Sequence, residues 1–164
     1  MYEVFVGLCR SLAGSALLPT IEFDAPLSGG GRLTVMEFLR PAEVAEVEAV
    51  LKRWYAGESG DPVSAVRAEA ERLDRVWADV IPYWGGVDLN PANVMLDLTG
   101  QIKFVDLFAS AGHKMFAALV EDPAEFTARV PANRRQFMTE IGYATRVWTP
   151  AQITAYRQAA SALP

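Results

Sequence analysis

Apolar residues recur at helical spacing along much of the chain. In the first half, the apolar positions lie three and four residues apart and predict helices over residues 2–12, 41–54 and 63–80. Pro41 suits the first turn of the second of these helices. In the second half, the pattern and candidate capping residues predict helices over residues 112–120, from Asn133 to Ala144, and from Thr149-Pro150 to Leu163.

Four shorter apolar runs have the β-branched and aromatic content that is typical of strands. Residues 17–23 and 33–39 flank a loop that contains Gly29-Gly30-Gly31, which predicts a hairpin with a flexible tip. Residues 94–96 and 102–105 flank a Thr-Gly turn and predict a second, tighter hairpin. Helices mixed with two hairpins predict the α+β class.

Composition and charge limit the functions open to the chain. A length of 164 residues with 51% hydrophobic and 21% charged residues predicts one compact domain. A net charge of -5 argues against a nucleic-acid partner. One cysteine and one histidine argue against a disulfide, zinc or haem, and no apolar run is long enough for a membrane span, so we expect a reducing cytoplasm. The sequence does not specify an oligomeric state.

The second hairpin has polar residues at both of its open ends. Asp88 and Asn93 precede its first strand, and Asp106 follows its second strand. Pairing of the two strands would bring these three side chains together, and carboxylate and amide oxygens suit Mg²⁺ with a bound phosphate. The alternative is an ordinary hairpin whose Asp and Asn side chains only cap turns.

Residues 87–106 resemble the catalytic loop and metal-binding hairpin of the protein-kinase-like superfamily, which includes aminoglycoside and choline kinases. The family pattern is H-x-D-x-x-x-x-N followed by a hairpin that ends in Asp-Phe-Gly. By this resemblance, Asp88 would orient or deprotonate the acceptor, and Asn93 and Asp106 would hold Mg²⁺ against the phosphates of ATP.

The resemblance also implies a base pocket and a minimal kinase-like fold. Residues 33–39 would be the strand and hinge between the lobes, with Glu37, Phe38 and Leu39 lining the adenine pocket and Met36 beside it. The alternative is that Met36 and Phe38 are plain core residues. Residues 1–40 would be a remnant of the N-terminal lobe, and residues 41–164 a mostly helical C-terminal lobe of the same single domain.

Several parts of the family pattern are missing from these 164 residues. Gly86 stands in place of the loop histidine, Leu107-Phe108 replaces Phe-Gly, and no Gly-rich loop with its lysine strand occurs. Arg10, Arg32 or a second chain would have to neutralise the phosphates. The missing parts favour a degenerate, pseudokinase-like binding or regulatory module that acts through a protein partner, with a nucleotide as a candidate ligand.

Two other hypotheses stay open. One is a minimal Mg-ATP-dependent phosphotransferase with Asp88 as base, and the other is an unrelated α+β domain in which the motif is a coincidence. The D-L-x-x-x-N-x-M loop that begins at Asp88 also resembles kinase-like proteins of bacteriophages, some of which act on host machinery.

Overall fold

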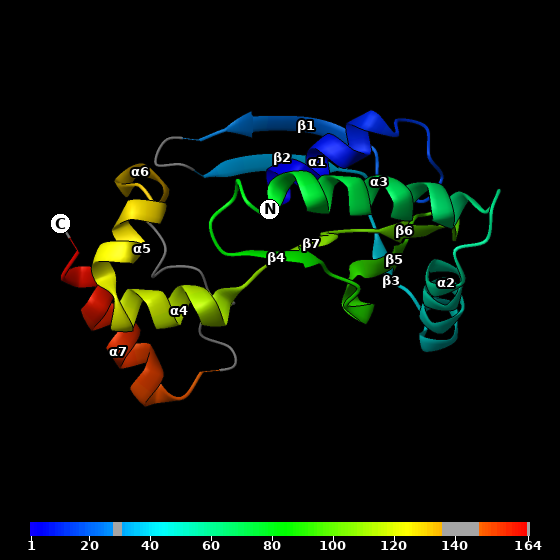
Figure 1. Ribbon diagram of the computed structural model, residues 1–164. Coiled ribbons are helices and arrows are strands. Elements are labelled where there is room, and N and C mark those ends of the chain that lie inside the picture. Colours follow the sequence, from blue (N-terminus) through cyan, green and yellow to red (C-terminus); the bar gives the residue numbers. More distant parts are fainter. Residues whose placement is uncertain (28–30, 136–147, 164) are drawn as a thin grey trace. The chain divides into compact units, whose positions relative to one another are not determined.

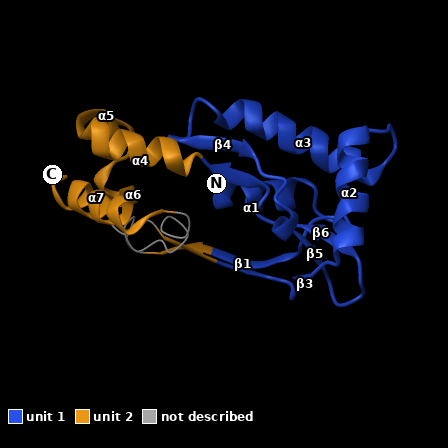
Figure 2. Cartoon of the chain, turned by 90° about the horizontal axis from the view of Figure 1, so that it is seen from below, with its two compact units in different colours: residues 1–24, 34–110 blue, residues 25–33, 111–164 orange. Residues whose placement is uncertain are grey.

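The computed structural model describes residues 1–27, 31–135 and 148–163 of the chain (Figure 1). The protein has a mixed α+β fold. It divides into two compact units, one formed by residues 1–24 and 34–110 and the other by residues 25–33 and 111–164 (Figure 2). The predicted flexible tip at Gly29-Gly30-Gly31 lies largely outside the described residues.

The three helices of the first unit follow the predicted pattern. They are α1 (Tyr2–Ser11), α2 (Val44–Ala56) and α3 (Pro62–Trp77). A capping box between Glu43 and Glu46 begins α2, and Asp61 accepts a hydrogen bond from the Val63 amide at the start of α3. The placement of Pro41 in a first helical turn was wrong, because this residue belongs to the short strand β3 (Arg40–Pro41).

Two small antiparallel sheets lie beside these helices. In one, β3 and β6 (Ile102–Phe104) flank β5 (Val94–Leu96), so the predicted tight hairpin β5–β6 is confirmed and gains a third strand. In the other, β4 (Trp84–Val87) pairs with β7 (Phe108–Ser110). The β4–β7 pairing brings the chain before Asp88 beside the chain after Asp106.

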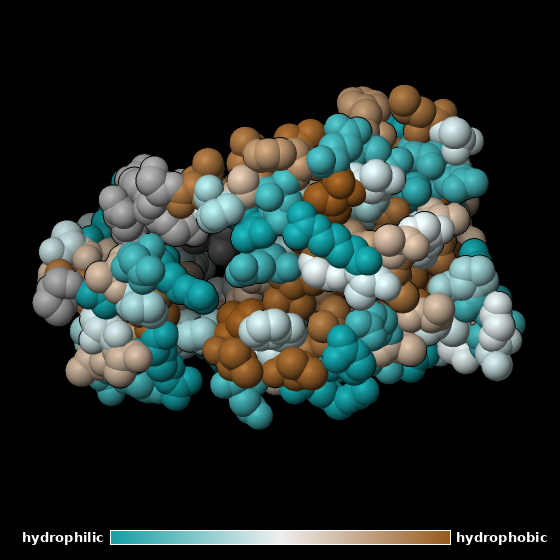
Figure 3. Space-filling view, turned by 90° about the horizontal axis from the view of Figure 1, so that it is seen from above, coloured by the Kyte–Doolittle hydropathy of each residue, from teal (hydrophilic) through white to brown (hydrophobic). Residues whose placement is uncertain are grey.

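The predicted first hairpin is present, but its strands are shifted along the sequence. Strand β1 (Ile21–Pro26) pairs with β2 (Arg32–Met36), and both strands pass from one unit into the other. Several apolar side chains of this hairpin are exposed to solvent, namely Phe23, Leu27, Leu33 and Val35. On the face shown in Figure 3, apolar side chains in brown lie among polar ones in teal.

The core of the first unit joins its helices to the tight hairpin. Phe5 and Leu8 of α1, Trp54 of α2 and Phe104 of β6 are buried in one hydrophobic cluster. The rings of Trp54 and Phe104 meet edge to face with their centroids 5.1 Å apart. Burial of this apolar surface is the main favourable term in folding, and it fixes the hairpin against α2.

The described part of the second unit contains helices α4 (Gly112–Glu121), α5 (Pro123–Arg129), α6 (Ala132–Arg135) and α7 (Pro150–Ser161), besides its share of the first hairpin. Leu119, Phe126 and Tyr156 are buried in it. The predicted cap at Thr149 is confirmed. Asn133 lies inside α6 rather than capping a helix, and most of the helix predicted to follow it lies outside the described residues. None of the described helices has the length and apolar character that a membrane crossing would require.

Candidate functional site

Strands β4 and β7 hold the beginning of the 88–106 loop beside its end. The Asp88 amide donates a hydrogen bond to the Leu107 carbonyl at 2.8 Å, which continues the β4–β7 ladder. The two backbones approach so closely that a Cβ atom on Gly85 would lie 2.9 Å from the Ala109 carbonyl oxygen. Glycine is therefore required at this position for the close approach.

Asn93 ties the two ends of the loop together. Its side-chain Nδ2 donates hydrogen bonds to the main-chain carbonyl oxygens of Asp88, at 3.4 Å, and of Asp106, at 3.1 Å. The main-chain carbonyl oxygen of Asn93 accepts a hydrogen bond from the Val105 amide at 2.8 Å. The chain approaches Asn93 through a short 3₁₀ helix, Pro91–Asn93, which Asn90 caps. The three residues selected from the sequence thus lie in one place.

Asp106 has an unusual backbone conformation and a perturbed carboxyl group. Its φ angle is 47°, in the left-handed region that few residues other than glycine, asparagine and aspartate adopt. Partial burial of the carboxyl group, and then the nearby negative charge of Asp88, raise the pKa of Asp106. Burial of the Tyr2 phenol on α1, and then the negative charge of Asp106, raise the pKa of that phenol.

The side-chain oxygen atoms of Asp88, Asn93 and Asp106 are of the kind that a hard cation binds. Because Nδ2 of Asn93 is used within the loop, its Oδ1 is the atom left for a ligand. Asp88 uses Oδ1 to accept from the Asn90 amide, which leaves Oδ2. Two repelling carboxylates and an amide oxygen form the kind of donor set that Mg²⁺ binds. Within the described residues, no group of three or more His, Cys, Asp or Glu side chains suits a metal, so this set depends on the amide.

The turn of the tight hairpin is held by Asp97, which the sequence reasoning did not select. Its Oδ1 accepts from the Thr99 amide, the Thr99 hydroxyl and the Gln101 amide, at 2.8, 2.7 and 2.9 Å. The hydroxyl contact is the largest cause of a lowered pKa for Asp97. An aspartate two residues before Thr-Gly is the sequence signal of such a turn.

Lys103 is a second residue that the sequence reasoning missed. It is buried on β6, donates to the Leu18 carbonyl oxygen at 3.3 Å, and pairs with Glu37 at 3.3 Å and Asp97 at 3.7 Å. A buried lysine requires such partners because an unpaired buried charge is costly. A lysine between Ile102 and Phe104 in an apolar run was the available signal.

Of the four predicted base-pocket residues, Met36 is the last residue of β2, and the other three follow this strand. Glu37 uses its carboxylate to accept from the Thr20 amide at 2.8 Å, and its own amide donates to the Thr20 carbonyl at 3.1 Å. Phe38 is 69% exposed, whereas Met36 and Leu39 are partly buried. Phe38 is therefore not a core residue, and the role of these residues in binding a base stays a prediction.

No family model matches the chain, and no match was found among curated proteins or among solved structures. The kinase-like resemblance therefore stays a prediction that depends on the residues and contacts described above.

Proposed function

We propose that the chain is a kinase-like binding module whose 88–106 loop binds Mg²⁺ together with a nucleotide, with little or no phosphoryl transfer. The observation that supports it most directly is the pair of hydrogen bonds from Asn93 to the main chains of Asp88 and Asp106. This bridge holds the ends of the loop together before any ligand arrives. A preorganised ligand set binds a cation without the cost of ordering the loop.

The donor set fits the proposed cation. Partial burial, and then the negative charge of Asp88, raise the pKa of Asp106, although the positive N-terminus of the chain acts in the opposite direction. A divalent ion bound there would relieve the repulsion between the two carboxylates and lower the pKa of Asp106. When bound, Mg²⁺ would supply charge neutralisation for the phosphates.

The binding role is favoured over catalysis by what the loop lacks. Gly86 replaces the histidine of the family pattern just before the loop, and Leu107-Phe108 replaces Phe-Gly just after it. Loss of one preorganised donor typically lowers a rate by about 10²–10³-fold. A module of this kind would act through a protein partner, a proposal supported by the exposed apolar side chains Phe23, Leu33 and Val35.

A minimal phosphotransferase is the second candidate. It is favoured by the free Oδ2 of Asp88, which lies in the loop beside the proposed cation ligands. In this role Asp88 would accept the proton of the attacking hydroxyl. This candidate predicts slow release of ADP that is lost in Asp88→Asn.

Thermal unfolding with MgCl₂ and ATP tests nucleotide binding. Ligand that binds only the folded state raises its stability by about 2.7 kcal/mol at one hundred times Kd, so the midpoint of the natural sequence should rise. Asp106→Asn should abolish this rise. Asparagine is the appropriate replacement because it tolerates the positive φ of Asp106.

Asp79→Asn is the matched control, since Asp79 is exposed and lies outside the loop. It should keep the full Mg-ATP response. An absent response in the natural sequence, or an equal one in Asp106→Asn, would contradict the nucleotide proposal. Measurement of ADP in the same samples separates the two candidates, because the phosphotransferase should release ADP in a way that depends on Asp88, whereas the binding module should release little or none.

A further inference from the structure

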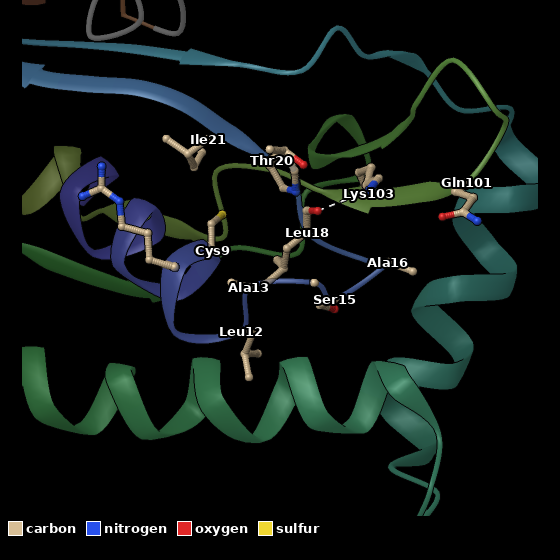
Figure 4. A pocket seen from close by; sticks show the side chains of 13 residues that line it. Cys9, Leu12, Ala13, Ser15, Ala16, Leu18, Thr20, Ile21, Gln101 and Lys103 are labelled. Atoms are coloured by element: carbon tan, nitrogen blue, oxygen red, sulfur yellow. Dashed lines mark hydrogen bonds between the residues drawn. The ribbon is translucent and has the colours of Figure 1, made fainter.

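The first unit contains a cavity of about 430 Å³ (Figure 4). It is formed by the end of α1, the segment from Leu12 to Thr20 that follows, the first residue of β1, and Gln101 and Lys103 of the tight hairpin. Its volume lies in the range of roughly 300–1,000 Å³ that is typical of small-molecule sites. None of Asp88, Asn93 and Asp106 lines it.

The charged residues that line the cavity are both cations, and each is paired with carboxylates that lie outside the lining. Among its 13 lining residues are two cations, Arg10 and Lys103, and no aspartate or glutamate, although the chain has a net charge of -5. Apolar side chains form much of the remaining wall. In Figure 4, Cys9 on α1, Leu18 in the segment before β1, and Ile21 at the start of β1 flank the same space. A wall of this kind is complementary to an acidic group on an apolar body.

The two cations differ in how freely they can meet a ligand. Lys103 is buried and held by the Leu18 carbonyl, Glu37 and Asp97. Arg10 has a side chain that is 57% exposed, and its ion pair with Asp24 joins Nη2 to Oδ2 at 3.1 Å. A guanidinium has five N–H donors in a planar fork, so this single contact leaves donors for a second carboxylate.

We propose that this cavity binds a small organic anion, with the acidic group on Arg10 and the apolar body against Cys9, Leu18 and Ile21. Lys103 stays with its partners in the wall and is not required to contact the ligand. The site is independent of the nucleotide proposal because none of the proposed cation ligands, Asp88, Asn93 and Asp106, lines the cavity. It can therefore be tested without Mg²⁺ or ATP.

A matched pair of probes tests the charge. 3-Phenylpropionate carries one carboxylate on an aromatic body, and 3-phenylpropanamide has nearly the same shape without the charge. Isothermal titration should show at least tenfold tighter binding of the acid to the natural sequence. Arg10→Gln should remove this preference, and Arg129→Gln should keep it. Arg129 is the matched control because it is 56% exposed and also makes one ion pair, with Glu125.

A second pair of variants tests the place of binding. Ala13 and Ala16 line the cavity but are exposed, so Ala13→Trp and Ala16→Trp should fill it without disturbing the core. Either should weaken 3-phenylpropionate binding at least tenfold, with circular dichroism to verify folding. If one variant fails to fold, the other decides.

The reactivity of Cys9 provides a chemical check within the cavity. It is the only cysteine in the sequence, and burial raises the pKa of its thiol to about 12, so alkylation should be slow. Bound 3-phenylpropionate should slow alkylation by iodoacetamide further, at least threefold, and equal concentrations of the amide should not. The proposal is overturned by equal affinity for acid and amide, by unchanged binding in Arg10→Gln, or by unchanged binding in a folded tryptophan variant.

Discussion

The two hairpins of the first 110 residues are built in opposite ways. β5 and β6 have three residues each, and most of their side chains are buried, whereas β1 and β2 have six and five residues and expose Phe23, Leu33 and Val35. The short hairpin has a turn held by Asp97 and lies on the core, and its open end carries the candidate cation site. Burial, rather than strand length, provides the fixed support that a binding site needs.

The sharpest test of this difference uses one phenylalanine from each hairpin. Phe104→Ala should lower the free energy of unfolding by about 3–5 kcal/mol, because the side chain is fully buried against Trp54. Phe23→Ala should change it by no more than about 0.5 kcal/mol, because Phe23 is 51% exposed. Urea unfolding followed by tryptophan fluorescence measures both. Similar losses would mean that the long hairpin is also packed in solution.

A smaller effect is expected at the turn of the tight hairpin. Gly100 has a φ of 83°, so Gly100→Ala should lower the free energy of unfolding by roughly 1–2 kcal/mol. Gly7→Ala is the control, because its Cβ would have nothing within 4 Å. In the middle of α1, that change should stabilise the protein by about 0.5–1 kcal/mol. The same urea titration applies, and a neutral Gly100→Ala would show that the turn relaxes freely.

The pH dependence of stability should reveal the turn carboxylate. Hydrogen bonds, first from the Thr99 hydroxyl and then from the Gln101 amide, lower the pKa of Asp97 below its ordinary value of 3.8. Its contribution is therefore complete above the unfolded value and is lost as the pH falls through the lowered folded pKa. The stability difference between the natural sequence and Asp97→Asn should shrink steadily from pH 6 to pH 2. A constant difference would contradict this account.

The smallest expected effect is at Asp106, at the open end of the tight hairpin. Here, unlike at Asp97, loss of the carboxylate should stabilise the protein. The folded state raises the pKa of Asp106, so it binds this proton more tightly than the unfolded state and loses stability as the pH rises from 3.8 through the raised value. Without divalent cations at pH 7, Asp106→Asn should stabilise the protein by roughly 0.2–1 kcal/mol, since exposure screens the repulsion. Differential scanning calorimetry at pH 3.5 and pH 7 should show the gain only at the higher pH.

Local signals in the sequence predicted the tight hairpin, the main helices and the meeting of Asp88, Asn93 and Asp106. Strands that depend on distant partners were harder to place. Leu17 belonged to a predicted strand, yet its carbonyl accepts from the Phe104 amide at 2.8 Å in a segment outside β1. Pro41 was assigned to a helix because local preference cannot anticipate its pairing with Met95. Lys103 was not selected because two of its partners, Leu18 and Glu37, lie far away in the sequence.

The left-handed backbone of Asp106 restricts how this position can change over time. Of the twenty residues, asparagine and glycine adopt that conformation with least strain, and Asp106→Asn differs from the present residue mainly in charge. A lineage that drifts to asparagine here would therefore retain the contour of the loop while its affinity for cations declined. At this position, the backbone shape of a binding site can persist after the charge that would bind a cation has been lost.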